Sequence, residues 1–170
     1  LKPIIRPYGK TLGDIIFENE KLEKLSERQQ AEKIGFVMQN PEHQIVTDKV
    51  WHELAFGLES LGYSTDEIQL RVTEMAEYFG ITDLYYNSVN QLSGGQKQLL
   101  NLAATMVMGP EILILDEPTA QLDPIAAENF LGTLKKINDE LGITVILSEH
   151  RLDNVLAYGN KVIVMDSGKI

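Results

Sequence analysis

Asp116 and Glu117 are adjacent carboxylates that directly follow the apolar run at residues 112–115. A carboxylate in such a position can hold Mg²⁺, either directly or through water. Its neighbour can orient or deprotonate a water molecule that attacks a phosphoryl group. The alternative interpretation is structural, because Pro118 begins a turn that either acid could cap. The pair is therefore a candidate centre for metal-assisted hydrolysis.

Polar residues follow two other apolar runs in the same way. Gln39 comes after residues 34–38, and Ser148, Glu149 and His150 come after residues 143–147. Ligands of open parallel sheets bind at the carboxyl ends of the strands, so three such matches predict one shared site. Taken alone, a histidine after a strand is more often structural than catalytic.

The pentapeptide Leu-Ser-Gly-Gly-Gln at residues 92–96 opens a predicted helix. Ser93 and Gln96 form a capping-box pair, which by itself describes a well-capped helix. Gly94 and Gly95 in the first turn cost about 1 kcal/mol each in helix propensity. Bare backbone N–H groups at the positive end of a helix, open to an anion, would offset that cost.

The elements that would position these residues alternate along the chain. The strands are apolar throughout, which is typical of a parallel sheet covered on both faces and predicts an α/β fold. The predicted strands are residues 13–17, 34–38, 112–115, 143–147 and 161–165, and the predicted helices are residues 26–32, 94–108, 123–141 and 151–158.

A block without an obvious strand separates the two halves. Residues 50–86 have mostly helical spacing, and residues 64–67 (Ser-Thr-Asp-Glu) form a second capping box. We therefore expect a sheet core made of residues 1–40 and 110–170, and a mostly helical subdomain at residues 41–109.

Composition removes several classes of protein from consideration. The 170 residues suffice for about one domain, and the formal net charge of -10 argues against a broad nucleic-acid-binding surface. With no cysteine, the chain can hold neither a disulfide nor a thiolate metal site. No stretch approaches the roughly 18 apolar residues that span a bilayer. The chain begins without Met or a signal-peptide pattern, so we expect it to be cut from a longer one.

The motifs and their order resemble the ATP-binding-cassette (ABC) ATPase domain. Residues 92–96 match the ABC signature motif letter for letter, and residues 112–117 resemble the Walker B motif with its catalytic glutamate. The resemblance covers nearly the whole chain. It implies a P-loop NTPase-like parallel sheet core with an inserted helical signature subdomain, in a fragment that lacks the N-terminal part of the domain.

Three weaker motifs gain meaning from this resemblance. Gln39-Asn40-Pro41 resembles the Q-loop, which touches Mg²⁺ and water and faces the membrane partner. His150 resembles the switch histidine that contacts the terminal phosphate. Residues 120–123 resemble the D-loop at the dimer interface, although Gln121 replaces the commoner small residue and leaves that local contact open.

The resemblance also implies a mechanism with ATP and Mg²⁺ as cofactors. ATP would bind between this chain and a second ABC ATPase subunit or domain, and closure would be passed to a transmembrane transporter subunit at the cytoplasmic face of the membrane. The implied site residues are Glu117 and His150 for catalysis, Asp116 and Gln39 for the metal, and Ser93, Gly94, Gly95, Gln96 and Asp123 for the nucleotide.

Residues 39–44, Val50 and residues 55–58 look like the energy-coupling-factor subgroup of ABC importers, which take up vitamins or transition-metal ions. This similarity predicts import of a small solute as the function. The competing interpretations are a non-transport ABC ATPase of DNA repair or translation, and a degenerate ABC domain that does not hydrolyse ATP.

A phosphate-binding P-loop is not found. The only Gly-Lys-Thr run is at residues 9–11, and Ile4 stands where its first glycine would have to be. Residues 1–3 resemble the segment just after the P-loop helix. We therefore expect the isolated chain to bind ATP weakly or not at all.

Overall fold

The computed structural model describes residues 12–167 and residue 169, without the side chains of Leu152 and Asn154. The Gly-Lys-Thr run at residues 9–11 and the segment at residues 1–3 lie outside the described residues. The helices are α1 (Glu27–Lys33), α2 (Val50–Ser60), α3 (Thr65–Tyr78), α4 (Gly94–Met106), α5 (Pro124–Leu141) and α6 (Leu152–Val155), with 3-10 turns η2 (Leu22–Lys24), η3 (Pro41–His43), η4 (Thr82–Leu84) and η5 (Val89–Gln91). The strands are β1 (Ile16–Phe17), β2 (Glu20–Lys21), β3 (Ile34–Val37), β4 (Ile112–Asp116) and β5 (Thr144–Ser148).

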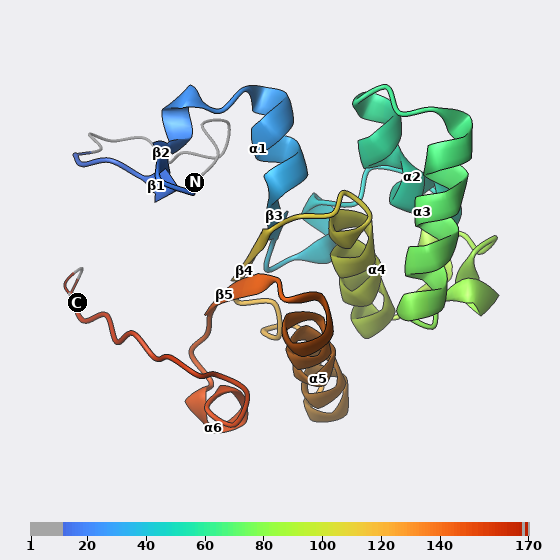
Figure 1. Cartoon of the computed structure of the whole chain (residues 1–170). Helices are drawn as coiled ribbons and strands as arrows, with labels where there is room; N and C mark the ends of the chain where they lie inside the picture. The colour runs from blue at the N-terminus through green and yellow to red at the C-terminus, as the bar shows by residue number, and fades with distance from the viewer. Residues whose placement is uncertain (1–11, 168, 170) are drawn as a thin grey trace.

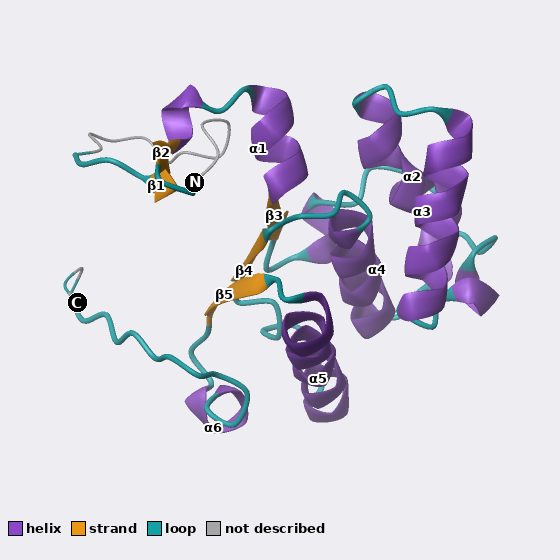
Figure 2. Ribbon diagram, viewed as in Figure 1, coloured by secondary structure: helices purple, strands orange, loops and turns teal. Residues whose placement is uncertain are grey.

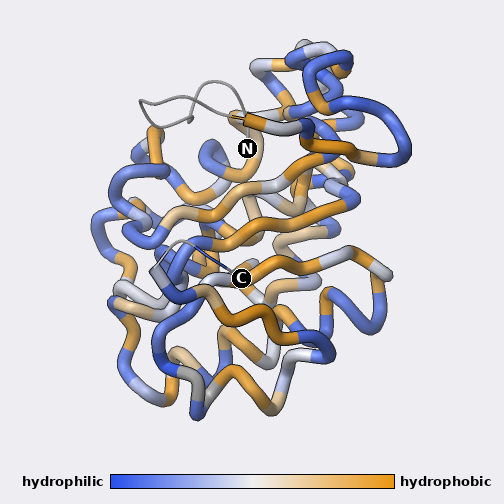
Figure 3. The backbone as a smooth tube through the Cα atoms, turned by 90° about the vertical axis from the view of Figure 1, so that its left-hand side faces the viewer, coloured by the Kyte–Doolittle hydropathy of each residue, from blue (hydrophilic) through white to orange (hydrophobic). Residues whose placement is uncertain are grey.

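The central sheet has the order β3-β4-β5, and both of its pairings are parallel. Ile112 of β4 is in register with Ile34 on one side and with Thr144 on the other. Figure 3 shows these hydrophobic strands running side by side. The sequence order β3, α4, β4, α5, β5 confirms the predicted α/β fold, because parallel neighbours require crossover connections.

One face of the sheet is covered by two helices. In Figure 1, α4 and α5 lie side by side next to the sheet, with α4 packed on β3 and α5 on β5. Leu113 and Leu115 of β4 belong to this core and are 0% and 1% exposed. Ile146 of β5 is 50% exposed, so the prediction that both faces are covered is wrong for the described residues.

The helical block is as expected. Helix α2 packs against both α4 and α3, and Leu54 and Leu58 of α2 join the same core as Leu100 of α4. The predicted capping box at the start of α3 is present, with Ser64 and its helix partner bonded reciprocally. Helices α2 and α3 therefore form a layer on the side of α4 that faces away from the sheet, as Figure 2 shows.

Two predictions near the C-terminal end are wrong. Residues 161–165 form no strand, and Figure 2 draws them as a loop leading to the C mark. Their apolar side chains stay exposed, with Val164 at 72%, and the segment pairs with no described strand, although β3 and β5 each have an open edge. Apolar content alone does not make a strand without such a partner. Helix α6 has four residues, where a helix over residues 151–158 was predicted.

The predicted strand at residues 13–17 also shrinks, to the two residues of β1, which pair antiparallel with β2 in a small hairpin. Among the described residues, no helix combines the length and the apolar character that a membrane span requires.

Candidate functional site

The carboxyl ends of the three central strands bring the predicted polar residues together. Asp116 is the last residue of β4 and is in register with Ser148, the last residue of β5. Gln39 follows β3 after one intervening residue, and Glu117 follows β4 directly. The parallel register thus assembles the cluster that the three strand ends predicted.

Glu117 lies at the centre of this cluster. Its Oε2 accepts a 3.1 Å hydrogen bond from the Gln39 side-chain amide, and its Oε1 lies 2.6 Å from His150 Nε2. Its backbone N–H donates to both the carbonyl and the hydroxyl oxygen of Ser148, at 3.1 and 3.2 Å. The carboxylate is therefore fixed from two sides while the backbone is tied to the neighbouring strand.

The Glu117 backbone adopts a left-handed conformation, with φ at 43°. In this region the Cβ of an L-residue crowds the following carbonyl, and the cost is about 1–2 kcal/mol. Strain of this kind persists only where the surroundings hold the residue in place, and it gathers at functional sites. The bonds from its backbone N–H to Ser148 supply that restraint here.

Asp116 is exposed and points its carboxylate to the same edge, where its Oδ1 accepts a 2.8 Å hydrogen bond from the Ser148 hydroxyl. The second oxygen of Asp116 and the side-chain oxygen of Gln39 are hard donors of the type that Mg²⁺ prefers. The Gln39 side-chain nitrogen donates to Glu117, so the side-chain oxygen of Gln39 remains available for a cation. Mg²⁺ takes one or two such protein oxygens and completes its coordination with water and phosphate oxygens. Among the described residues, no group of three or more acidic, histidine or cysteine side chains could hold a metal ion.

The contact between His150 and Glu117 is open to solvent. The His150 side chain is 83% exposed and that of Glu117 is 27% exposed. Exposed ion pairs contribute little to stability because water and salt screen them. The pair can therefore separate at little cost when another charged group enters.

Two residues that received no individual role in the sequence analysis support the loop after Glu117. Glu149 Oε1 accepts hydrogen bonds from the backbone N–H and the hydroxyl of Thr119, at 3.1 and 2.6 Å, and Thr119 is 3% exposed. Ser148 bonds to both Asp116 and Glu117. The sequence feature that could have identified Ser148 and Glu149 is their position directly after the apolar run at residues 143–147.

The glycine-rich pentapeptide lies on a different element, at the start of α4. Ser93 and Gln96 form the predicted capping box, with bonds of 2.9 and 3.3 Å. Ser93, Gly94 and Gln96 are exposed, and Gly95 is half-buried. A Cβ on Gly94 would meet no atom within 4 Å, so the fold itself does not require glycine there.

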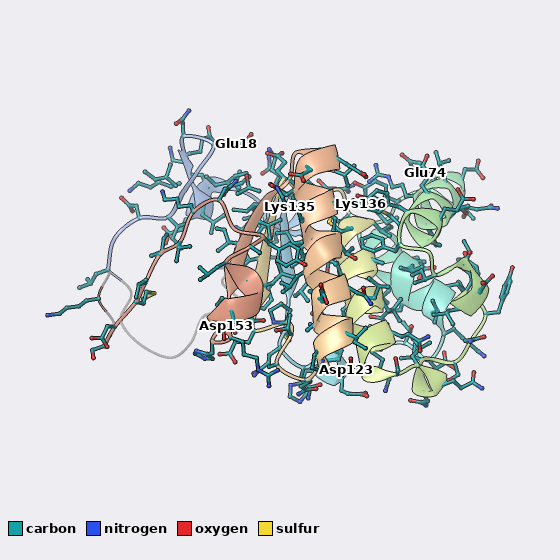
Figure 4. All side chains as sticks on the ribbon, turned by 90° about the horizontal axis from the view of Figure 1, so that it is seen from below. Glu18, Glu74, Asp123, Lys135, Lys136 and Asp153 are labelled. Atoms are coloured by element: carbon teal, nitrogen blue, oxygen red, sulfur yellow. The ribbon has the colours of Figure 1, made fainter. Side chains whose placement is uncertain are left out.

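Asp123 caps α5, whose first turn is seen in Figure 4 at the end of the helix opposite Lys135 and Lys136. Its Oδ1 accepts from the backbone N–H groups of Ile125 and Ala126, at 3.0 Å each. The predicted helix start is confirmed. The role in nucleotide binding stays a prediction, and this oxygen already has two partners.

Comparison with known proteins points to one family. The sequence model of the family described as "ABC transporter" matches residues 1–120. An ABC transporter ATP-binding protein of Bacillus cereus is 54% identical over the whole chain, and one of Methanosarcina acetivorans is 37% identical over the same length. The chain spans 31% and 51% of the lengths of these two relatives.

Solved structures give the same result. CbiO1 of Clostridium perfringens, part of the ABC transporter complex CbiONQ, superposes with a TM-score of 0.85 at 36% identity, over 94% of this chain and 64% of that one. A dimeric ATP-binding cassette in a post-hydrolysis state with ADP and phosphate gives 0.78 at 27% identity, over 94% and 72% of the two chains.

Proposed function

We propose, since this chain belongs to the ABC transporter family, that it is the part of an ATP-binding subunit where ATP hydrolysis is catalysed and coupled to import of a small solute. The observation that carries the proposal is Glu117, held in a strained backbone conformation between Gln39 and His150 at the carboxyl end of the sheet. That geometry suits a group that must meet a reacting atom in one orientation.

Glu117 would orient and polarise the water molecule that attacks the γ-phosphate. The Glu117 side chain is 27% exposed, and a carboxylate that a water molecule can reach can take part in proton transfer of this kind. His150 now pairs with Glu117 through a solvent-open contact, and it would exchange that partner for the terminal phosphate. Its imidazole would then stabilise the charge that develops there.

Asp116 and Gln39 would hold Mg²⁺, together with water and the phosphates. The bound cation would neutralise charge on the phosphate oxygens. Ser148 supports this arrangement, because its hydroxyl fixes one oxygen of Asp116 and leaves the other available.

Ser93, Gly94, Gly95 and Gln96 would close on the nucleotide held by a second ABC ATPase subunit or domain. Exposed N–H groups at a helix start are suited to a phosphate, because the helix dipole and the bare glycine backbone both favour an anion. The dimeric arrangement of one structural neighbour supports this reading of the motif.

The proposed solute is a vitamin or a metal ion, and the proposed partner is a transmembrane subunit that this chain meets at the cytoplasmic face of the membrane. Support comes from CbiO1, which belongs to a multi-subunit transporter complex and shares 36% identity with this chain.

The experiment that tests the proposal is ATP hydrolysis by the full-length protein carrying Gly94→Ala. The fold has room for this methyl group, so helix α4 should be at least as stable as before. A phosphate bound against the start of α4 would instead clash with the methyl group. We expect hydrolysis to fall by about 10²-fold or more, because the methyl group would keep the phosphate away from the helix N–H groups, with a loss like that of one donor to a developing charge. Gly132→Ala in α5, also without a neighbour within 4 Å, is the matched control and should keep full activity. Full activity of Gly94→Ala would contradict the proposal.

A further inference from the structure

Two buried amide side chains on α4 hold the chain segment that leaves β3. Gln98 and Asn101 are each 1% exposed. The Gln98 amide nitrogen donates to the carbonyl of Met38 at 3.1 Å, and that of Asn101 donates to the carbonyl of Pro41 at 3.4 Å. These carbonyls lie on either side of Gln39.

Further contacts join α4 to the same segment, residues 36–44, which we call the β3 exit segment. The Gln44 side chain accepts from the backbone N–H of Met38 at 2.9 Å, and it donates to the carbonyl of Phe36 at 3.1 Å and the hydroxyl of Thr105 on α4 at 3.4 Å. Lys97 of α4, whose side chain is 13% exposed, forms an ion pair with the exposed Glu42.

The partners on α4 are residues 97, 98, 101 and 105, which span more than two turns of the helix. Contacts spread over such a length fix orientation as well as distance. The β3 exit segment and α4 therefore behave as one body, although α2 and α3 lie between them in the sequence.

The buried amides are not explained by packing alone. Gln98 Oε1 and Asn101 Oδ1 are buried and accept no hydrogen bond from the part of the chain that the structure describes. An unpartnered buried acceptor is unfavourable, and an apolar side chain of similar size would avoid it. What an apolar side chain could not supply is the donated bond to Met38 or Pro41. The hydrogen bonds to the backbone on either side of Gln39 thus explain why amide side chains occupy these two buried positions.

We propose that Gln98 and Asn101 are positioning residues that couple the start of α4 to the catalytic cluster. The path runs from Ser93 at the start of α4, through Gln98 and the Met38 carbonyl, to Gln39 and then to Glu117. This inference rests on the proposed function. In that function, the start of α4 contacts the nucleotide held by the second ATPase subunit, and Glu117 acts on the nucleotide bound to this chain. The link would therefore couple the two ATP sites.

The test is a double-mutant cycle on ATP hydrolysis in the full-length protein. If Gln98 acts through Gln39, Gln98→Leu should lower kcat by roughly 2- to 30-fold, the range expected for residues that modulate coupling, with little change in KM for ATP. In a Gln39→Ala background, Gln98→Leu should then have almost no further effect. If Gln98→Leu lowered kcat by the same factor in the wild-type and the Gln39→Ala backgrounds, the proposal would be overturned.

Gln30→Leu is the matched control. Gln30 of α1 is also a buried amide, 6% exposed, and donates to two backbone carbonyls, those of Leu22 and Leu25, at 3.2 and 2.9 Å. Its loss should lower stability and leave kcat unchanged. An equal loss of kcat in Gln30→Leu would show that Gln98 acts only through stability.

A second measurement needs no hydrolysis and separates this proposal from the proposed function. Amide hydrogen exchange over residues 38–44 should become faster in Gln98→Leu and stay unchanged in Gln30→Leu. If Gln98→Leu fails to fold, Glu42→Gln removes the charge that pairs with Lys97, keeps the core intact and should speed the same exchange. Unchanged exchange would overturn the link, whereas absent hydrolysis by the wild-type protein would overturn only the proposed function.

Discussion

The left-handed backbone of Glu117 predicts that two substitutions at this position differ in stability although both abolish activity. Replacing Glu117 by Gly or by Ala removes the same side-chain contacts to Gln39 and His150. Only Gly also removes the steric cost of φ at 43°, about 1–2 kcal/mol. Gly loses roughly 0.5–1 kcal/mol of this advantage through its greater freedom in the unfolded chain.

The Gly variant should therefore be more stable than the Ala variant by about 1 kcal/mol. For a domain of this size that difference corresponds to about 2–4 °C in the melting temperature. Thermal and urea unfolding of the two variants, followed by circular dichroism, measure it directly. Both variants should have lost ATP hydrolysis when they are placed in the full-length protein.

Comparing Gly with Ala, rather than with the wild type, cancels the effect of the lost carboxylate. If the Gly variant melted at the same temperature as the Ala variant or below it, Glu117 would not be strained. The argument that its backbone is held for function would then fail.

Two further predictions concern the parts of the fold that support the site. Gly35→Ala in β3 should destabilise the protein by about 1–3 kcal/mol in urea unfolding, because the new Cβ would lie 2.6 Å from Thr105 Cγ2; unchanged stability would refute this packing. Burial, reinforced by the hydrogen bond to Glu140, raises the pKa of Tyr78 from its usual 10 to about 12. The stability that this shift contributes is present below pH 10 and is lost as pH rises to 12, so Tyr78→Phe should show a shallower loss of unfolding free energy across that window. Equal slopes for the two proteins would argue against the shift.

The sequence predicts the sheet core well where apolar runs end in polar residues. Residues 112–115 and 143–147 lie in or beside strands, and parallel pairing alone then brings Asp116 close to Ser148. Capping residues locate helix starts as reliably, because Ser64, Ser93 and Asp123 act on their own first turns.

Features that depend on distant partners escape this reasoning. Residues 161–165 are as apolar as the other strands, yet they pair with no described strand, and composition does not reveal which segments will pair. The positive φ of Glu117 and the contacts of Gln98 and Asn101 likewise arise from chain segments far apart in sequence. A buried amide at a helical position looks like any surface amide until its carbonyl partner is known.

The central claim is that Glu117 activates water for ATP hydrolysis, and Glu117→Gln in the full-length protein tests it most directly. The amide keeps the size of the side chain and removes its ability to take a proton. With Mg²⁺ and ATP, we expect phosphate release to fall by about 10²- to 10⁴-fold, while unhydrolysed ATP stays bound after desalting. Phosphate release at the wild-type rate would contradict the account.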